Sequence, residues 1–245
     1  MDKSAKDEFI STVSHELRTP LTSIRGALAL VVSGAAGTLP DKVQQLLVVA
    51  HRNSERLVHI VNDILDAEKV EAGKMRVTLQ SVPVLAFLEQ ALVYNEPYAK
   101  KFGTRFTLQE APANTSITAD PDRLMQVMSN LLSNAAKFSP AGAETLIRAH
   151  ERGGRIVIEV QDSGPGIPED FMPHVFEKFA QARNSSAPKH EGTGLGLNLS
   201  RQLVELMQGE ISFTTQPGRG TTFSIFLPIC EEDAQPNTES RPEVA

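Results

Sequence analysis

The chain has 245 residues, of which 40% are hydrophobic and 22% charged, the balance of a globular protein with room for one large domain or two smaller ones. Its net charge of −6 disfavours a nucleic-acid partner held through phosphates, and its single cysteine, Cys230, cannot close an internal disulfide, which fits a reducing cytoplasm. Because no apolar stretch reaches the ~20 residues that cross a bilayer and no signal peptide follows Met1, we expect a cytoplasmic chain or the cytoplasmic part of a longer protein.

Apolar residues recur at intervals of three and four through the first 72 residues, which predicts two long helices. The stripe on the first helix comprises Ile10, Val13, Leu17, Leu21, Ile24, Leu28 and Val31, and that on the second comprises Val43, Leu46, Ala50, Leu57, Val61 and Ile64. Glycine and proline over residues 33–40 break the pattern between them. One hairpin buries only part of two such stripes, so we predict that two copies pair as a four-helix bundle in a homodimer.

After Gly73 the pattern changes to short strands mixed with helices. Strands are expected at 75–80, 105–110, 116–119, 145–151, 155–161, 210–215 and 221–228, and helices at 84–101, 121–137 and 193–207. A hairpin turn at Arg152-Gly153-Gly154 makes neighbouring strands antiparallel, which favours a two-layer α/β sandwich over a βαβ array. The expected α+β chain thus has a helical hairpin (1–73), a sandwich (74–230) and an acidic, proline-rich, disordered tail (231–245).

His15 lies roughly 160° around the first predicted helix from the apolar stripe, so we expect its imidazole to face solvent. A neutral imidazole is a nucleophile near neutral pH, and Glu16 could orient the ring through a hydrogen bond. Thr19, one turn later, shares the exposed face, and Pro20 bends the helix at a cost of ~3 kcal/mol, which marks a place where shape matters. The alternative is a surface histidine and a solvated glutamate without function.

The predicted helix 121–137 carries Asn130, Asn134 and Lys137 at spacings of four and three, which places all three on one face. Two amide oxygens and an ammonium group on one face suit Mg²⁺ together with phosphate, because Mg²⁺ takes oxygen ligands and keeps several waters. An ordinary polar helix face is the alternative interpretation of this pattern alone.

Two glycine-rich loops follow. Asp162 ends a predicted strand, where its carboxylate could accept a hydrogen bond from an exocyclic amine, and Gly164 and Gly166 would let the backbone approach a flat base. The second loop precedes a helix whose free N–H groups would bind an anion, and its spacing differs from that of a dinucleotide fold. It comprises Gly192, Thr193, Gly194, Leu195 and Gly196. Residues 169–191 between the loops, with Phe176 and Phe179, are typical of a mobile lid.

Together these segments resemble the catalytic core of a bacterial sensor histidine kinase over nearly the whole chain. FISTVSHELRTPL is similar to the H-box of that family, NLLSNAAKFS to its N-box, and DSGPGI, FEKF and GTGLGL to its G1, F and G2 boxes. GRGTTF matches the glycine turn before the last strand, and all the motifs stand in the family's order.

The resemblance implies a role for each motif. His15 would be the phospho-acceptor assisted by Glu16, and Asp162 would read the adenine amine of ATP. Asn134 would bind Mg²⁺, with Asn130 and Lys137 at the phosphates. Gly192, Gly194 and Gly196 would fold over the phosphates, and Phe176 and Phe179 would couple the lid to nucleotide binding. Glu191 stands where many relatives have glycine, which could alter the flexibility of the lid.

The resemblance therefore predicts a two-component signal-transduction enzyme that autophosphorylates His15 from ATP and passes the phosphoryl group to an aspartate on a response-regulator receiver domain. Phosphatase activity toward the regulator, with Thr19 orienting a water, is also expected. Two alternatives stay open, a clamp ATPase of the related gyrase and chaperone fold and a non-catalytic scaffold. The sequence does not decide whether a subunit phosphorylates itself or its partner. It shows no upstream sensor domain, so we expect it to be part of a longer protein.

Overall fold

The computed structural model describes residues 3–35, 37, 39–181 and 193–230, and in the first helix it describes side chains from Glu16 onward apart from that of Arg18. The chain divides into two compact units, Met1–Arg76 with Glu191–Leu199, and Val77–His190 with Ser200–Ala245. The helices are α1 (Lys3–Val32), α2 (Asp41–Glu71), α3 (Val84–Phe102), α4 (Pro121–Phe138), a 3₁₀ turn (Met172–His174) and α5 (Gly196–Leu206). The strands are β1 (Gln80–Pro83), β2 (Arg105–Glu110), β3 (Ser116–Ala119), β4 (Glu144–Arg152), β5 (Arg155–Gln161), β6 (Glu210–Gln216) and β7 (Gly220–Pro228).

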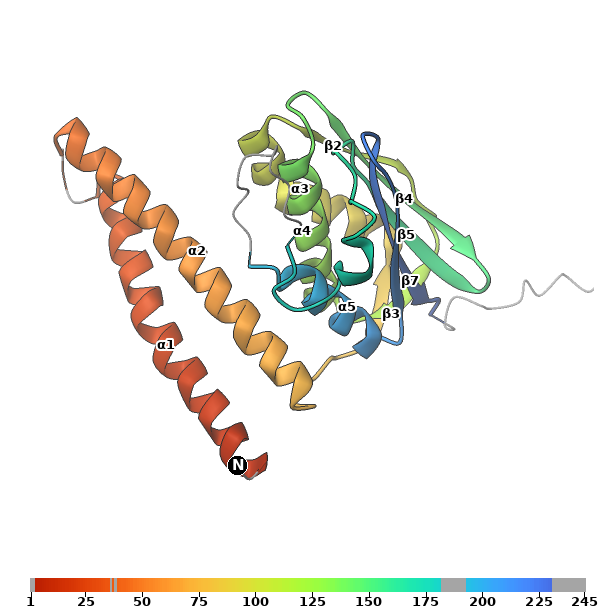
Figure 1. Ribbon diagram of the computed structural model, residues 1–245, viewed down its shortest axis with the longest axis horizontal. Helices are drawn as coiled ribbons and strands as arrows, with labels where there is room; N and C mark the ends of the chain where they lie inside the picture. The colour runs from red at the N-terminus through yellow and green to blue at the C-terminus, as the bar shows by residue number, and fades with distance from the viewer. Residues whose placement is uncertain (1–2, 36, 38, 182–192, 231–245) are drawn as a thin grey trace, which may run out of the picture. The chain divides into compact units, whose positions relative to one another are not determined.

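The first unit contains a hairpin of two long helices, α1 and α2, which lie side by side (Figure 1). The predicted pair of helices is confirmed, and both keep large apolar side chains open to solvent. Leu17 is 43% exposed, Ile24 50%, Leu46 71%, Val49 54% and Leu57 46%. A single hairpin therefore leaves much of its apolar stripes uncovered, as the periodicity predicted. None of the described helices is both long and apolar enough to cross a membrane.

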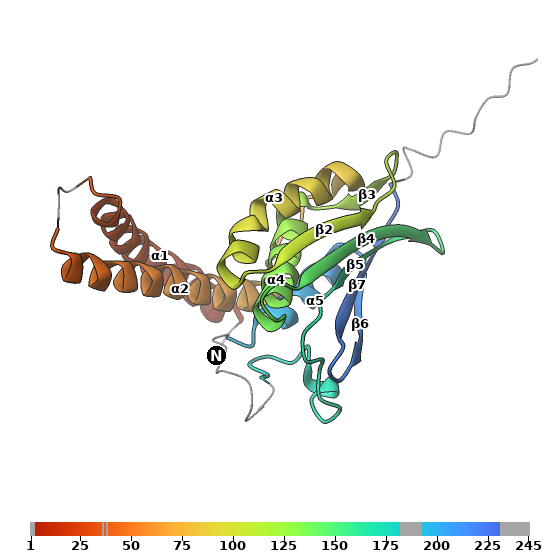
Figure 2. The ribbon, with the colours of Figure 1, turned by 90° about the horizontal axis from the view of Figure 1, so that it is seen from above.

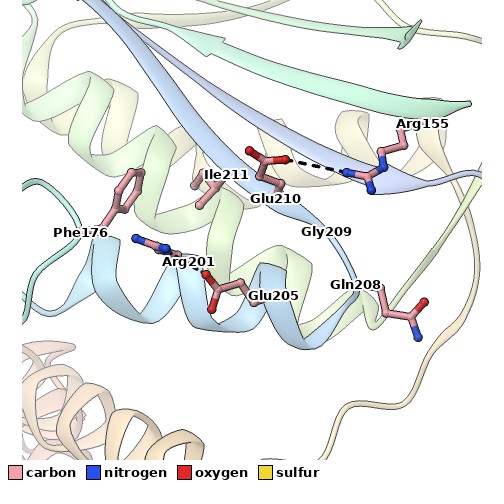
Figure 3. A pocket seen from close by; sticks show the side chains of 8 residues that line it. All are labelled: Arg155, Phe176, Arg201, Glu205, Gln208, Gly209, Glu210 and Ile211. Atoms are coloured by element: carbon pink, nitrogen blue, oxygen red, sulfur yellow. Dashed lines mark hydrogen bonds and ion pairs between the residues drawn. The ribbon is translucent and has the colours of Figure 1, made fainter. Parts of the chain in front are cut away.

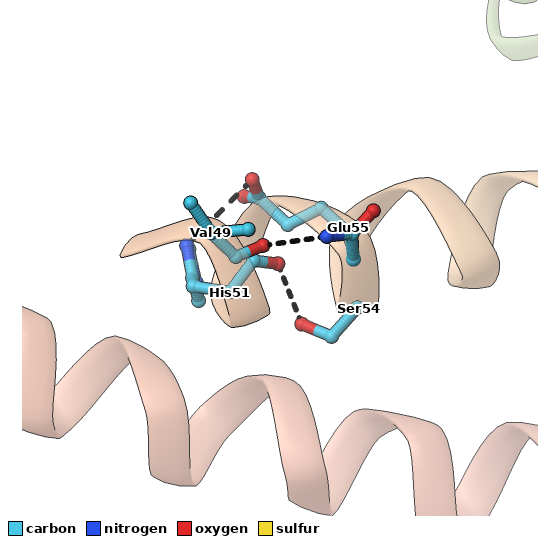
Figure 4. Close-up of polar contacts among 5 residues, drawn as sticks. Val49, His51, Ser54 and Glu55 are labelled. Carbon is cyan, nitrogen blue, oxygen red and sulfur yellow. Dashed lines mark hydrogen bonds and ion pairs between the residues drawn. The ribbon is translucent and has the colours of Figure 1, made fainter. Parts of the chain in front are cut away.

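Polar side chains in the middle of α2 bond within their own helix (Figure 4). The Ser54 hydroxyl donates to the His51 carbonyl at 2.7 Å, and the Asn53 amide donates to the Val49 carbonyl at 2.9 Å. Ser54 is buried and points toward α1, whereas Glu55 points away from it. Because its hydroxyl is satisfied locally, this small residue can sit between the helices without an unpaired polar group.

The second unit is the expected two-layer sandwich, with α3, α4 and α5 from Ser200 onward on one face of a five-stranded sheet (Figures 1 and 2). The strand order is β2-β4-β5-β7-β6, with β2 parallel to β4 and the other neighbours antiparallel. Alternate strand residues face the helices and form the core with apolar residues of α4. These include Ile147, Ile156, Ile158, Ile225, Leu124, Met128 and Leu131, all fully buried or nearly so.

Most predicted strands and helices match the observed elements to within one or two residues. The strand predicted at 75–80 is wrong, because β1 begins only at Gln80 and pairs with β3 in a separate two-stranded sheet. Residues 75–79 alternate as a strand would, but β3 has just four residues and ends where Asp120 begins to cap α4, so the ladder stops there. α5 begins at Gly196 rather than Thr193. The tail predicted at 231–245 lies outside the described residues.

Candidate nucleotide-binding site

Asp162 follows the last residue of β5 and uses one carboxylate oxygen to organise its surroundings. Its Oδ1 accepts hydrogen bonds from the backbone N–H of Gly164 at 2.8 Å and of Thr221 at 3.1 Å. Its Oδ2 has no hydrogen-bond partner among the described residues. Burial raises the pKa of this carboxyl above 3.8, and the two backbone N–H groups oppose the rise. The side chain is 9% exposed, so a ligand that reached Oδ2 would meet an oriented acceptor with little water around it.

Two glycines keep the backbone around Asp162 close together. Gly166 has φ +75°, and a Cβ there would lie 2.5 Å from the carbonyl oxygen of Gln216. Gly220 has φ +106°, and a Cβ there would lie 2.0 Å from the carbonyl oxygen of Asp162. No other residue type fits either position without moving backbone, since both distances are far below a van der Waals contact. The loop after β5 and the β6–β7 turn are thus held against each other.

α4 is positioned by a strong N-terminal cap. Asp120 accepts from the backbone N–H of Asp122 and Arg123 at 3.1 Å each, Pro121 occupies the first turn, and the Asp120 Oδ2 accepts from the N–H of Thr78. The cap fixes where α4 starts, and with it the face that carries the predicted asparagines.

The two asparagines of α4 form a chain of hydrogen bonds that ends on α5. The Asn134 Nδ2 donates to the Asn130 Oδ1 at 3.3 Å, and the Asn130 Nδ2 donates to the Ser200 Oγ at 2.9 Å. Asn130, predicted to contact phosphates, therefore joins α4 to α5 and orients Asn134. The Asn134 Oδ1 has no partner in the described part of the chain and is open to a ligand.

The donor set around Asn134 fits a magnesium ion held mainly by phosphate oxygens and water, with one amide oxygen from the protein. Among the described residues, no three His, Cys, Asp or Glu side chains gather as an all-protein metal cage. The predicted phosphate ligand Lys137 places its Nζ 4.7 Å from the centre of the Phe138 ring, one turn beyond Asn134. Its ammonium group thus lies near the end of α4.

The second glycine loop leads directly into α5. The Leu195 N–H donates to the Thr193 Oγ1 at 3.2 Å, Gly194 has φ +72°, and Gly196 is the first residue of the helix. Leu195 is buried and anchors this end of the loop. Gly192 and Glu191 lie outside the described residues, so their predicted roles remain predictions.

The two phenylalanines of the predicted lid differ. Phe176 packs against Phe213 and Phe223, with ring centroids 5.9 and 6.4 Å away, and Val175 beside it is buried. Phe179 is 66% exposed and has φ +61°, a backbone conformation that a bulky residue rarely adopts. The segment up to Gln181 is thus anchored on the sheet through Phe176 rather than loose throughout. Residues 182–191 lie outside the described part of the lid.

A hollow of about 420 Å³ opens beside Phe176, between α5 and the start of β6 (Figure 3). Its charges compensate one another, because the Arg201 Nε lies 2.8 Å from Glu205 and an Arg155 nitrogen lies 3.9 Å from Glu210. With each cation beside an anion, this hollow offers no net charge to a phosphate ligand. It is separate from the groups around Asp162.

The predicted phospho-acceptor lies in the other unit. His15 is a residue of α1, but its side chain is among those not described. Glu16 and Thr19 are described and exposed, and the Thr19 carbonyl accepts from the Ser23 hydroxyl at 3.1 Å. Pro20 lies within the helix, as the sequence shows.

Sequence reasoning missed three hydroxyl residues of the site, namely Ser200, Thr215 and Thr221. Thr221 contacts Asp162, Thr215 contacts Thr221, and Ser200 accepts from Asn130. Threonine is common in strands, so its presence in β6 and β7 carried no signal by itself. The antiparallel pairing of two predicted strands across GRGTT could have placed Thr215 opposite Thr221.

Comparison with known proteins gives two family matches in chain order. Residues 5–73 match the His Kinase A (phospho-acceptor) domain, and residues 119–231 match the histidine kinase-, DNA gyrase B- and HSP90-like ATPase family. Together these two matches include the α1 histidine and the groups around Asp162 and Asn134.

Individual relatives agree with the family matches. The circadian input-output histidine kinase CikA of Synechococcus elongatus is 36% identical over 98% of this chain and 32% of its own length. The autoinducer 2 sensor kinase/phosphatase LuxQ of Vibrio vulnificus is 34% identical over 99% of this chain and 29% of its own. Full-length ShkA, solved in complex with AMPPNP, superposes with a TM-score of 0.75 at 29% identity, covering 91% of this chain and 46% of that one. This chain thus spans about a third of the length of the curated relatives.

Proposed function

This chain carries the catalytic core of a sensor histidine kinase, and we propose that it transfers the γ-phosphoryl group of ATP to His15. The observation that carries the proposal is that the two carboxylate oxygens of Asp162 differ in their hydrogen bonds. Its Oδ1 is fixed by two backbone N–H groups, which leaves Oδ2 to accept from the adenine amine. Binding of adenine at this oxygen would fix the position of the nucleotide and thus of its phosphates.

The remaining groups supply positioning and charge. The Asn134 Oδ1 would hold Mg²⁺, which when bound neutralises phosphate charge. The Gly194–Gly196 backbone and the positive end of α5 would bind phosphate oxygens. Phosphoryl transfer depends mostly on such positioning, so the protein's main task is to align the γ-phosphoryl group with a nitrogen of His15. Glu16, the adjacent carboxylate, would orient that ring.

In the reaction itself, a lone pair on a nitrogen of His15 forms a bond to the γ-phosphorus while the bond from that phosphorus to the β,γ-bridging oxygen breaks, leaving ADP. The second step passes the phosphoryl group to an aspartate oxygen of a response-regulator receiver domain, as in a two-component phosphorelay. The exposed apolar side chains of α1 and α2 support a homodimer in which two hairpins form a four-helix bundle. We propose that the hairpin of 1–73, the ATP-binding sandwich of 74–230 and the tail of 231–245 are the working divisions.

We further propose that the core dephosphorylates its regulator. Thr19 is exposed one turn after His15, where its hydroxyl would orient a water for attack on the acyl phosphate. The name of the LuxQ relative, a kinase/phosphatase, supports this second activity.

The kinase proposal is tested with purified full chain and Mg²⁺·ATP labelled on the γ-phosphate. The wild type should acquire label that is acid-labile and base-stable, and His15→Gln should acquire none while it binds ADP with wild-type affinity. Label on His15→Gln would identify another acceptor. Hydrolysis of ATP without labelled protein would favour a clamp ATPase, and failure to bind nucleotide would favour a scaffold.

The phosphatase proposal is tested with the cognate regulator, first identified by profiling phosphotransfer against purified receiver domains. Thr19→Ala should keep at least half of the autophosphorylation rate yet slow the decay of the phosphorylated regulator several-fold in the presence of ADP. Thr22→Ala, an exposed threonine three residues along α1, is the matched control. Equal decay with wild type and Thr19→Ala would exclude the role.

A further inference from the structure

Thr215 on β6 joins three segments around Asp162 through a single hydroxyl. Its Oγ1 lies 2.9 Å from the backbone nitrogen of Ile167, 3.1 Å from the carbonyl oxygen of Gly220 and 3.0 Å from the Thr221 Oγ1. These partners belong to the loop after β5 and to the first two residues of β7, so that together with β6 three segments are joined. Thr215 is half-buried and pairs directly with Thr221 in the sheet.

The donors and acceptors around this hydroxyl can be assigned. The Ile167 N–H can only donate and the Gly220 carbonyl can only accept, so Thr215 gives its single hydrogen to Gly220. The hydrogen in the bond between the two threonines must then come from Thr221. Thr221, next to Asp162, therefore keeps only lone pairs for any further partner.

The same segments meet at Asp162. Thr221 donates its backbone N–H to the Asp162 Oδ1 at 3.1 Å and accepts from the Asp162 N–H at 2.9 Å. The Gly218 N–H donates to the Pro165 carbonyl at 2.8 Å, which closes the turn over the loop. Thr215 stands behind this arrangement and itself has no bond to Asp162, so it acts through Thr221 and the loop.

We propose that Thr215 is a positioning residue that makes this site select purines with a 6-amino group over purines with a 6-oxo group. The inference rests on the proposed function, in which the Asp162 Oδ2 reads the base. By fixing the loop after β5 and its contact with Thr221, which donates to the Asp162 Oδ1, Thr215 keeps the Asp162 Oδ2 aimed at the ligand as an acceptor. A 6-amino group donates to this oxygen, whereas a 6-oxo group presents an oxygen to a carboxylate and is repelled.

The test compares Mg²⁺·ADP with Mg²⁺·IDP, which differ at the 6-position of the purine, by titration calorimetry on the full chain. Thr215→Val keeps the shape of the side chain and removes the hydroxyl. We expect it to weaken ADP binding about tenfold and IDP binding less than threefold, so that the ADP preference shrinks. Thr215→Ser restores the hydroxyl and should return both affinities to within about twofold of wild type.

Thr214→Val is the matched control, because it is the same substitution at the adjacent position on the opposite, exposed face of β6. Its ADP preference should equal that of the wild type. Thr215→Ala is measured in parallel and replaces Thr215→Val where the valine variant does not fold, as judged by its thermal midpoint.

Two outcomes overturn the inference. One is an unchanged ADP preference in the variants that lack the hydroxyl, including a uniform loss for both nucleotides, which would mark Thr215 as merely structural. The other is a serine variant that behaves as the valine variant does. A wild-type chain that binds neither nucleotide would instead refute the proposed function.

Discussion

At the scale of single residues, the site depends on the different roles of the two carboxylate oxygens of Asp162. The sequence predicted this residue, because an acidic side chain at a strand end before two glycines is a local pattern. It could not predict that Thr221, 59 residues later, fixes Oδ1, because that contact exists only through the pairing of β5 with β7. The bond from Asn130 to Ser200 was hidden for the same reason, since Ser200 lies on another helix.

Replacing Asp162 by asparagine should exchange the hydrogen-bond acceptor that faces the base for a donor. The oxygen of the new side-chain amide would stay with the N–H groups of Gly164 and Thr221, which places the NH₂ group where Oδ2 now faces the ligand. We expect Asp162→Asn to weaken ADP binding at least tenfold, because two donors would then face each other, while the fold is kept. Calorimetry and circular dichroism check this. Asp170→Asn, an exposed carboxylate of the same loop, should bind ADP as the wild type does.

The β6–β7 turn offers a second comparison at this scale. Gly218 and Gly220 both have positive φ, at +76° and +106°, but a Cβ at Gly218 meets nothing within 4 Å, whereas one at Gly220 collides with the Asp162 carbonyl. Gly218→Ala should cost about 1 kcal/mol of stability from backbone strain and still bind ADP. Gly220→Ala should lose ADP binding and lower the thermal midpoint much further. Similar behaviour of the two variants would show that strain alone matters.

At the scale of elements, the long helices and most of the strands were predictable from local patterns, and the strand expected at 75–80 was not. α1 and α2 match because thirty residues repeat the same interval, so local errors average out. The strand predicted at 75–80 was wrong because alternation shows only that a segment could be a strand. The partner strand β3 is too short to pair with it. The separate β1–β3 sheet and the 3₁₀ turn at Met172–His174 likewise depend on contacts that no local pattern records.

α2 contains a carboxyl group whose protonation should affect helix stability. Burial raises the pKa of Asp63 from 3.8 to about 6, His59 opposes the rise and the Asp66 carboxylate adds to it. Because the pKa is higher in the folded state, the group contributes stability fully below pH 3.8 and loses that contribution as the pH rises through about 6. The loss is on the order of 1 kcal/mol after allowance for solvent screening.

Asp63→Asn should therefore raise the thermal midpoint by a few degrees at pH 7.5 and change it little at pH 5, since the amide carries no charge to desolvate. Melts followed by circular dichroism at both pH values measure this. Asp41→Asn removes an exposed carboxylate from the same helix. It should shift the thermal midpoint by the same amount at the lower and at the higher pH. A midpoint of Asp63→Asn that shifts equally at both pH values would show that burial of the charge is not the cause.

At the scale of the whole molecule, the two units differ in how well each buries its own apolar residues. The second unit closes a core around Ile147, Ile158 and Leu131, each at most 1% exposed. The hairpin leaves Leu46 71% exposed and Val49 54% exposed. A unit with a closed core can fold as a monomer, whereas a pair of half-covered helices needs a second copy to bury its stripes.

The two parts should therefore separate cleanly. Residues 1–73 alone should be helical and dimeric, and residues 74–230 alone should be monomeric and bind Mg²⁺·ADP with an affinity within about threefold of the full chain. Light scattering at micromolar concentration gives the masses, and calorimetry gives the affinity.

Leu46→Glu places a charge in the exposed stripe and should dissociate the full chain while leaving ADP binding intact, because burying an unpaired carboxylate costs more than the lost contacts return. Glu55→Leu is the control on the other side of α2. Because Glu55 points away from α1, we expect it to lie outside the bundle, and the variant should keep the mass of the dimer. A monomeric hairpin, or a Leu46→Glu chain that stays dimeric, would mean that the exposed stripe of α2 is covered by something other than a second copy.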